Sequence, residues 1–283
     1  MQETQLLNGD EIIAVMRQVH GLDVSIYNET FLAKSVQRRQ TATAIKEFVD
    51  YIRHLSENRL EAEFFFKSLN IPYSMFFRNP LTFSLLEQVV FPALFAQKKT
   101  SGQRELRIWS AGCAAGQEAW SVAILLAELS AVQDKPVSYR IFATDHSEAE
   151  LALARSGVYP VDALGNIRLR QLDGYFSRQG EAYAIATSLK EKVEFSRYNL
   201  LDETSSSPAE SIYGDFDLIL CCNVLYYYRP ELQQMIIDKL LGNMAKNGYL
   251  VTGETEQQIV GTTNGLDAIA PSVSIFQHKI FRR

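Results

Sequence analysis

Cysteine, histidine and long apolar runs are scarce in this chain of 283 residues, and each scarcity excludes a class of protein. Its three cysteines, Cys113, Cys221 and Cys222, are not spaced for a disulfide framework or a zinc site, so we expect buried thiols. The four histidines are scattered, with no pair at helical ligand spacing, and no metal is expected. No apolar run reaches the roughly 18 residues of a membrane helix, and residues 1–4 lack the features of a signal peptide. We therefore expect a cytoplasmic protein without membrane insertion.

A strong excess of charge of one sign is also missing. The chain has 28 Lys and Arg against 33 Asp and Glu, which gives a formal net charge of -5 at pH 7. A nucleic-acid-binding protein needs a concentrated basic face, so nucleic acid is not an expected partner. The candidate basic face is a row formed by Lys34, Arg38 and Arg39, which is either a surface for a partner or an ordinary solvated helix surface.

The first part of the chain has apolar residues at helical spacing. Two such stripes are formed by Ile12, Ile13, Met16 and Val19 and by Ile45, Phe48, Val49, Ile52 and Leu55. They predict a small helical domain with a linker helix over residues 1–98, in which Asn28 caps the second helix. The polar run 98–105 follows a helix that should end near Phe95, and it suits a linker.

Strands and helices are expected to alternate over residues 104–283. Strands are predicted at 106–109, 138–144, 193–198, 216–222 and 248–252, with an added edge strand at 273–281. The near-continuous apolar run 216–222 predicts a strand buried on both faces, and therefore an α/β fold with a parallel sheet covered by helices. Glycines and aromatic residues interrupt the alternation at about 160–192, which predicts a small inserted hairpin subdomain.

A loop of small residues, from Gly112 through Cys113 to Gly116, joins the first predicted strand to a helix. Small side chains let a ligand approach the backbone, and the start of the helix offers unpaired N–H groups. The loop lacks the G-x-G-x-x-G spacing of dinucleotide-binding proteins, which argues against a nicotinamide dehydrogenase. We interpret it as a cofactor loop of another kind.

Polar side chains near this loop complete the candidate site. Asp145 ends the second predicted strand, where a carboxylate accepts two hydrogen bonds from a ribose diol; the alternative is a helix N-cap before Ser147. Glu118 either accepts a hydrogen bond from the ammonium of a methionine moiety or simply stabilises the helix N-terminus. Asn223 ends the fourth strand. Loop, acid and amide together predict an S-adenosylmethionine site.

These residues resemble the CheR family of chemoreceptor glutamate methyltransferases, in the family's order and over nearly the whole chain. The matching stretches are Ser74 to Arg78, Trp109 to Ser121, Ala143 to Asp145, Ala154 to Tyr159, Asn199 to Leu201 and Phe216 to Tyr228. The resemblance implies a Rossmann-like class I methyltransferase sheet with a small N-terminal helical domain and a small antiparallel β insertion. It also implies transfer of a methyl group from S-adenosylmethionine, leaving S-adenosylhomocysteine, to glutamates of the cytoplasmic domain of methyl-accepting chemoreceptors in chemotaxis signalling. The short insertion resembles that of members that do not dock the receptor's C-terminal peptide.

The resemblance also assigns site residues. Around the cofactor, beside Gly112, Cys113 and Gly116, it places Ser74, Arg78, Glu118, Asp145, Asn199, Leu200, Cys222 and Asn223. It places Arg78 and Tyr227 near the transferred methyl group as catalytic residues, whereas the alternative for Arg78 is an interdomain salt bridge.

Several positions depart from the family pattern. Pro72 and Ser74 stand where Asn and Thr are usual, Cys222 where Arg is usual, and Gly253 to Glu256 where Gly-His-Ser-Glu is usual. Because Pro72 has no backbone N–H and no side-chain amide, it cannot supply the cofactor hydrogen bond that the resemblance implies for the usual Asn. The alternative functions are a related methyltransferase with a different protein or small carboxylate substrate, and a non-catalytic regulator that binds S-adenosylmethionine.

Overall fold

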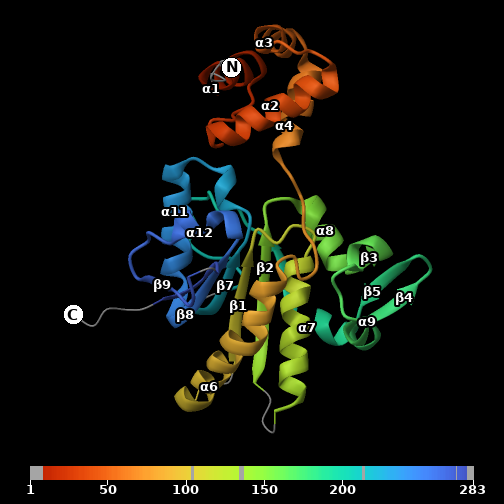
Figure 1. Cartoon of the computed structure of the whole chain (residues 1–283), viewed down its shortest axis with the longest axis vertical. Coiled ribbons are helices and arrows are strands. Elements are labelled where there is room, and N and C mark those ends of the chain that lie inside the picture. Colours follow the sequence, from red (N-terminus) through yellow and green to blue (C-terminus); the bar gives the residue numbers. More distant parts are fainter. Residues whose placement is uncertain (1–8, 103–104, 134–136, 212–213, 272, 279–283) are drawn as a thin grey trace. The chain divides into compact units, whose positions relative to one another are not determined.

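The computed structural model describes residues 9–102, 105–133, 137–211, 214–271 and 273–278, and the chain divides into two compact units (Figure 1). The helical unit contains the chain up to residue 71 together with residues 226–234. The sheet unit contains residues 72–225 and the chain from residue 235 onward. Among the described residues, no helix is both long and apolar enough to cross a membrane.

The helical unit is a bundle whose apolar stripes meet in its centre. Its elements are α1 (Gly9–Ala14), the π-helical η1 (Val15–Val19), α2 (Glu29–Thr43), α3 (Phe48–Glu57) and α4 (Arg59–Leu69). Its core contains Ile12, Met16, Leu32, Val36, Tyr51, Leu55 and Phe65. The predicted cap of α2 is confirmed, because the Asn28 side chain accepts a hydrogen bond from the Thr30 N–H at 2.9 Å.

A segment far along the chain completes this unit. The Asn28 N–H donates to the carbonyl oxygen of Tyr227 at 2.8 Å, and the Arg229 N–H donates to that of Ile26 at 3.1 Å. The rings of Phe31 and Tyr227 meet edge to face, with centroids 4.8 Å apart. Residues 226–234 therefore belong to the helical unit, although sequence reasoning placed them in the sheet domain.

The sheet unit is built on a seven-stranded sheet of order β6-β2-β1-β7-β8-β10-β9. Its strands are β1 (Glu105–Ala111), β2 (Ser138–Asp145), β6 (Val193–Arg197), β7 (Phe216–Cys221), β8 (Met244–Thr252), β9 (Leu266–Ala268) and β10 (Ile275–His278). Strands β6, β2, β1, β7 and β8 run parallel, whereas β10 pairs antiparallel with both β8 and β9. The predicted α/β fold is confirmed, and every residue of β7 is buried.

The predicted edge strand is wrong in one respect. Residues 275–278 of the expected 273–281 strand form β10, but β9 pairs with its outer side and is itself the edge. Residues 279–281 lie outside the described part of the chain. Strand β9 spans three residues, of which Leu266 is buried, so it carries almost no apolar alternation for sequence reasoning to detect.

Helices cover the sheet with apolar side chains. One face is covered by α5 (Pro80–Leu85), η2 (Leu86–Val90), α6 (Phe91–Ser101) and α7 (Gln117–Ala131). The remaining helical elements outside the insertion are α8 (Glu148–Ser156), η4 (Leu225–Tyr227), α11 (Pro230–Gly242), η5 (Glu254–Glu256) and α12 (Gln257–Val260). Tyr226 and Tyr227 of η4 and the first residues of α11 belong to the helical unit.

The expected linker at 98–105 is wrong, because α6 continues to Ser101. Lys98 is 6% exposed, and its ammonium group forms an ion pair of 2.9 Å with Asp217 of β7. Phe91 and Phe95 pack in the core of the sheet unit. Residues 72–98 therefore group with the sheet rather than with the helical domain that we expected over 1–98. Lysines are mostly exposed, so the sequence alone gave no sign that Lys98 is buried against a partner more than a hundred residues away.

The predicted antiparallel insertion is confirmed. It consists of β3 (Val158–Pro160), η3 (Val161–Leu164), α9 (Leu169–Tyr175), β4 (Phe176–Gln179), β5 (Ala182–Ile185) and α10 (Thr187–Lys190). Its strands form a sheet of order β3-β5-β4, which lies to the side of α7 and α8 in Figure 1. Both of its strand pairs are antiparallel.

Lys98→Met should lower the free energy of unfolding by about 3 kcal/mol, because Asp217 would stay buried without its cation. The measurement is urea unfolding. Lys99→Met is the matched control, since Lys99 is exposed and its removal should change stability little. Adding Asp217→Leu to Lys98→Met should recover most of the loss, and equal losses in the two single lysine variants would contradict the role of the ion pair.

Candidate functional site

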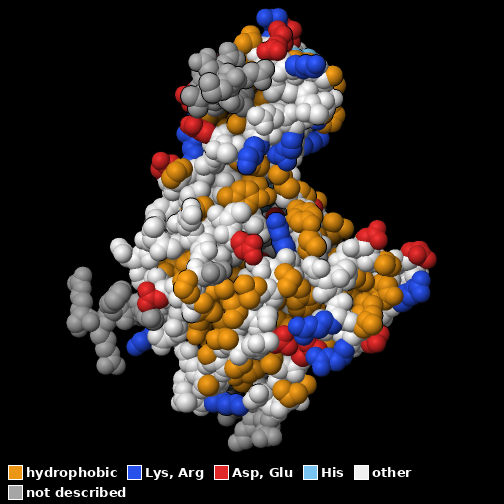
Figure 2. Space-filling model, in the orientation of Figure 1, with side chains coloured by type: hydrophobic (Ala, Val, Ile, Leu, Met, Phe, Trp, Pro, Cys, Tyr) orange, Lys and Arg blue, Asp and Glu red, His pale blue; other side chains and the backbone are white. Residues whose placement is uncertain are grey.

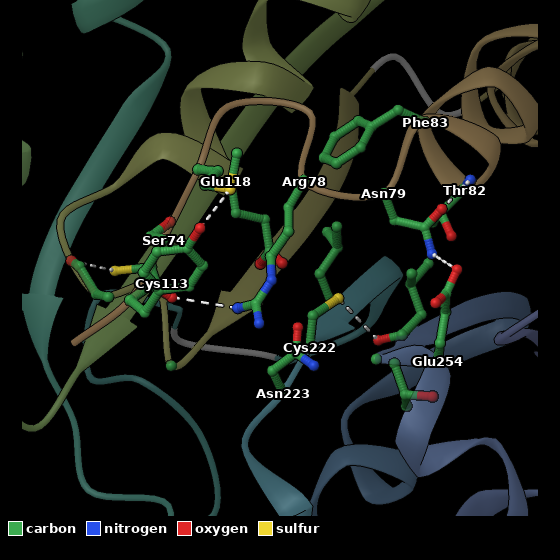
Figure 3. Close-up of a pocket in the computed structure, with 18 of the residues that line it drawn as sticks. Ser74, Arg78, Asn79, Thr82, Phe83, Cys113, Glu118, Cys222, Asn223 and Glu254 are labelled. Atoms are coloured by element: carbon green, nitrogen blue, oxygen red, sulfur yellow. Dashed lines mark hydrogen bonds between the residues drawn. The ribbon is translucent and has the colours of Figure 1, made fainter. Parts of the chain in front are cut away.

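The strand order reverses between β1 and β7. From β1 the chain adds β2 and β6 on one side, and it then returns to add β7 and β8 on the other. Loops that leave two strands in opposite directions separate at their carboxyl ends and leave a crevice. A cavity of about 330 Å³ lies at this place, bordered by residues 73–83 and by the ends of β1, β7 and β8 (Figure 3).

The cofactor loop is pinned to the neighbouring strand. The N–H groups of Gly112 and Cys113 both donate to the Thr144 carbonyl oxygen, at 2.8 and 2.9 Å. Gly112, Cys113 and Ala114 border the cavity, whereas Gly116 does not. The loop backbone is thus held at the end of β2 while part of it faces the hollow.

The two glycines of the loop are required by packing and backbone conformation. Gly112 has φ +79°, and a Cβ there would lie 2.7 Å from a methyl group of Val224. Gly116 has φ +88°, and its Cβ would lie 2.8 Å from the Cβ of Ala154. Any residue other than glycine would be strained at either position. The structure therefore explains these glycines without a ligand, which differs from the reason that we expected from the sequence.

Asp145 is buried beside the loop and not on the cavity wall. One of its oxygens accepts from the Ala114 N–H at 2.9 Å, and the other accepts from the Ser147 N–H at 2.9 Å. Burial opposes ionisation, but hydrogen bonds from His146, Ser147 and Ala114 outweigh it and hold the pKa of Asp145 below its usual range. The helix-cap alternative is wrong, because the N-cap of α8 is Ser147. A role at a ribose stays a prediction.

Glu118 lies on the cavity wall at the start of α7. The Ser110 hydroxyl donates to its Oε1 at 2.7 Å. Burial raises the pKa of Glu118, while hydrogen bonds from Ser110 and Cys222 and the charge of Arg78 oppose that rise. A half-buried carboxylate whose charged form is disfavoured by burial gains from a bound cation, so its chemistry fits the ammonium of a methionine moiety.

Arg78 points into the cavity in Figure 3. Its Nη1 donates to the Tyr73 carbonyl oxygen at 3.2 Å, and the guanidinium carbon lies 5.0 Å from the centroid of the Tyr73 ring. Within the described part of the sheet unit, Arg78 forms no ion pair with an acidic residue. Its charge is therefore available to an anionic ligand.

The far wall of the cavity depends on a carboxylate that sequence reasoning did not assign. Glu256 is fully buried, and its oxygens accept from the N–H groups of Asn223 at 2.9 Å, Leu225 at 2.7 Å and Gly253 at 2.7 Å. Asn223 itself has φ +61°. Glu256 thus ties the loop after β7 to the loop after β8. The sequence could have indicated Glu256, because it ends the Gly253–Glu256 stretch that was compared with the family pattern.

At the mouth, the Asn79 amide donates to Glu254 at 2.7 Å, which joins residues 73–83 to the loop after β8. Further lining residues to which sequence reasoning gave no role are Tyr73, Met75, Pro80, Thr82, Phe83, Leu220, Val251, Thr252, Gly253 and Thr255. Some of them lie inside the stretches named from the sequence, and the others lie close to one in the chain.

The structure brings most of the predicted site residues together. On the cavity wall are Ser74, Arg78, Gly112, Cys113, Glu118, Cys222 and Asn223. Asn199 and Leu200 follow β6 and do not border the cavity. Tyr227 belongs to the helical unit, and its catalytic role stays a prediction. The predicted burial of thiols holds best for Cys113 and Cys221, while Cys222 is partly exposed.

Burial raises the pKa of the Cys222 thiol well above its usual range, and the charge of Glu118 adds to the rise. The thiol therefore stays neutral, and it donates to the Val251 carbonyl oxygen at 3.8 Å.

Among the described residues, no group of three or more His, Cys, Asp or Glu side chains could hold a metal ion.

Comparison with known proteins connects this geometry to a cofactor. The family model described as "CheR methyltransferase, SAM binding domain" matches residues 73–270. The chain is 28% identical to an uncharacterized 104.1 kDa protein of Rhodobacter capsulatus, over 87% of this chain and 25% of that protein, so it spans a quarter of that relative's length. It is 28% identical to a chemotaxis protein methyltransferase of Borreliella burgdorferi, over 93% of each chain. It is 33% identical to chemotaxis protein methyltransferase 1 of Pseudomonas aeruginosa, over 65% of each chain.

The wall residues suit S-adenosylmethionine, because the cavity offers a partly buried carboxylate for its ammonium group. Glu118→Gln should weaken the binding of S-adenosylhomocysteine about 10-fold or more, since a charge-assisted hydrogen bond becomes a neutral one. Isothermal titration calorimetry measures the change. Glu254→Gln is the control, because Glu254 borders the same cavity but is exposed. Unchanged affinity in Glu118→Gln would remove Glu118 from the binding site.

Proposed function

We propose that this chain, which belongs to the CheR methyltransferase family, transfers the methyl group of S-adenosylmethionine to glutamate side chains of chemoreceptors. The acceptors are the cytoplasmic domains of methyl-accepting chemoreceptors, and the product is a glutamate methyl ester that serves adaptation in chemotaxis. The observation that carries the proposal is the cavity at the reversal of strand order, with Glu118 and Arg78 on its wall. The names of the Borreliella and Pseudomonas relatives support the acceptor class.

A glutamate acceptor suits a site of this composition. Its reference pKa of about 4.3 leaves the side chain ionised at neutral pH, so no general base is required. The described residues that line the cavity include no histidine. When bound, S-adenosylmethionine supplies a methyl group on a positively charged sulfur, and the opposite charges of donor and acceptor disappear as the ester forms. Residues that align the two reactants and exclude water therefore contribute more than a proton carrier would.

The residues of the site then have tasks of binding or orientation. Glu118 on the cavity wall accepts from the ammonium group of the donor. Asp145 lies behind the cofactor loop and off the wall, and it keeps acceptor capacity for the ribose hydroxyls because a carboxylate has about four lone-pair sites. Arg78 orients the acceptor carboxylate. A tight pair between Arg78 and that carboxylate would stabilise the reactant as much as the transition state, so alignment is the useful part of the contact.

Arg78→Ala should lower methyl transfer about 100-fold, because a misaligned nucleophile loses most of the advantage of proximity. The assay incubates the protein with labelled S-adenosylmethionine and membranes of its host, and it scores a base-labile methyl ester on a receptor band. Circular dichroism verifies that the variant is folded. Arg168→Ala is the control, since Arg168 is exposed and pairs with Glu87 outside the cavity.

Near-normal receptor labelling by Arg78→Ala would exclude Arg78 from the reaction. Two other outcomes would contradict the proposed acceptor for the unmodified protein. Methyl esters on a different protein or on a small carboxylate, with no labelled receptor, indicate a different substrate. Binding of S-adenosylhomocysteine without any methyl transfer indicates a regulator.

The helical unit has a groove whose charge suits an acidic receptor segment. Its volume is about 470 Å³, and it is lined by Phe31, Lys34, Gln37, Arg38, Thr41, Ile71, Tyr226 and Tyr227. Figure 2 shows Lys and Arg side chains on the surface of the helical unit. We propose that an acidic segment of the receptor binds in this groove, because a positive groove attracts a negative segment.

The basic row expected from the sequence is therefore divided. Lys34 and Arg38 line the groove, whereas Arg39 donates to both oxygens of Glu61, at 2.9 and 2.7 Å. The Tyr51 hydroxyl also donates to Glu61 at 2.9 Å. Arg39 is thus part of the structure of the unit and not of the groove.

Lys34→Glu combined with Arg38→Glu should raise the KM for receptor about 10-fold, because both attractive charges become repulsive. Steady-state kinetics on receptor-containing membranes measures the KM, and calorimetry with S-adenosylhomocysteine should give unchanged affinity. Arg53→Glu on α3 is the control, since Arg53 is exposed and lies outside the groove. An unchanged KM in the double variant would exclude the groove as the receptor site.

A further inference from the structure

A buried tyrosine of the small antiparallel sheet contacts two segments that form the cavity wall. Tyr159 of β3 is 3% exposed. Its hydroxyl donates to the carbonyl oxygen of Ala115 in the cofactor loop, at 2.6 Å. Its ring meets the ring of Phe76 edge to face, with centroids 5.0 Å apart and planes at 85°. Phe76 precedes Arg78 by two residues, so one side chain touches both the loop and the segment that carries Arg78.

The insertion holds Phe76 by further contacts. The ring of Phe176 in β4 packs against it with centroids 5.6 Å apart. The Asn166 side-chain amide donates to the Phe76 carbonyl oxygen at 3.1 Å. The position of Phe76 is therefore set by the small sheet and its connection, and not by the cofactor loop alone.

The next residue turns the chain toward the cavity. Phe77 has φ +48°, a left-handed conformation that is unfavourable for a bulky side chain. Its N–H donates to the Ser121 hydroxyl oxygen at 3.0 Å, and that hydroxyl donates to the Gln117 carbonyl oxygen at 2.7 Å. The Phe77 ring packs against Phe83, with centroids 5.2 Å apart. The direction of Arg78 thus depends on a strained turn, and its neighbours must hold that turn in place.

We propose that Tyr159 is a positioning residue that couples the cofactor loop to Arg78. Its hydroxyl contacts the cofactor loop and its ring contacts Phe76. A movement of the loop on ligand binding therefore shifts residues 76–78, and a movement of residues 76–78 shifts the loop. The proposal rests on the proposed function in that it takes Arg78 to act in methyl transfer. Tyr159 itself touches neither reactant.

Tyr159→Phe tests the coupling, because it removes the hydroxyl and keeps the ring. Tyr183→Phe is the matched control: Tyr183 pairs with Tyr159 across the β3–β5 ladder, and its hydroxyl makes no hydrogen bond to a described residue. Tyr159→Phe should lower kcat about 10-fold with an unchanged receptor KM, since a misplaced Arg78 impairs alignment more than binding. Tyr183→Phe should change neither constant. A structural role alone would lower the melting temperature and leave kcat unchanged.

A double-mutant cycle with Arg78→Ala decides whether Tyr159 acts through Arg78. If it does, Tyr159→Phe should cost little further activity once Arg78 is absent. If the loss of activity in the double variant equals the product of the losses in the two single variants, the two residues act independently and the proposal is overturned.

Hydrogen exchange supplies a readout that needs no activity. In the unmodified protein and in Tyr183→Phe, S-adenosylhomocysteine should slow amide exchange in a peptide that covers residues 75–79. In Tyr159→Phe this protection should be lost or strongly reduced. Equal protection in all of them would overturn the coupling. A protein that binds S-adenosylhomocysteine but transfers no methyl group contradicts the proposed function, and the exchange data then decide the coupling separately.

Discussion

The reversal of strand order between β1 and β7 is the constraint on which the site depends. It separates the loops that leave these strands, and the cavity is the space between them. Hydrogen bonds to two acceptors fix the loops on either side of that space. The Thr144 carbonyl oxygen accepts from two amides of the cofactor loop, and the buried Glu256 carboxylate accepts from amides of the loops after β7 and β8. The shape of the cavity thus depends on the strand order and on the Glu256 carboxylate, and the side chains that line it determine its chemistry.

The charges on the wall are few and opposite. Glu118 is half-buried, and burial raises its pKa, so its charged form gains from a cation, whereas Arg78 is exposed and faces the cavity without an acidic partner in the described part of the sheet unit. A reaction in which a negative nucleophile meets a positive donor loses charge as it proceeds, so a site that excludes water favours it without proton transfer. Burial also keeps the Cys222 thiol neutral, so it adds no charge beside Glu118.

Sequence patterns predicted the parts of the fold that repeat locally. The continuous apolar run of β7 predicted a doubly covered parallel sheet, and the break in alternation after Tyr159 predicted the inserted antiparallel strands. Non-local contacts were the parts that could not be predicted. The partner of Lys98 lies on β7, so the end of α6 looked like a linker, and residues 226–234 join helices from the other end of the chain.

The same division applies to the site. Residues in motifs at strand ends, such as Glu118, Cys222 and Asn223, were predicted and lie on the cavity wall. Glu256 and Tyr159 shape that wall through hydrogen bonds to backbone groups distant in the sequence, which no local pattern reveals. Asp145 lies beside the cofactor loop but does not border the cavity, and its role at a ribose stays a prediction. No local pattern in the sequence indicated its hydrogen bonds with Ala114 and Ser147.

A crystal structure of the complex with S-adenosylhomocysteine tests the central claim most directly. The account predicts ligand density in the cavity of about 330 Å³, with the amino group of the ligand beside the Glu118 carboxylate. Density at another place, or a cavity closed by the protein's own side chains under saturating ligand, would contradict it.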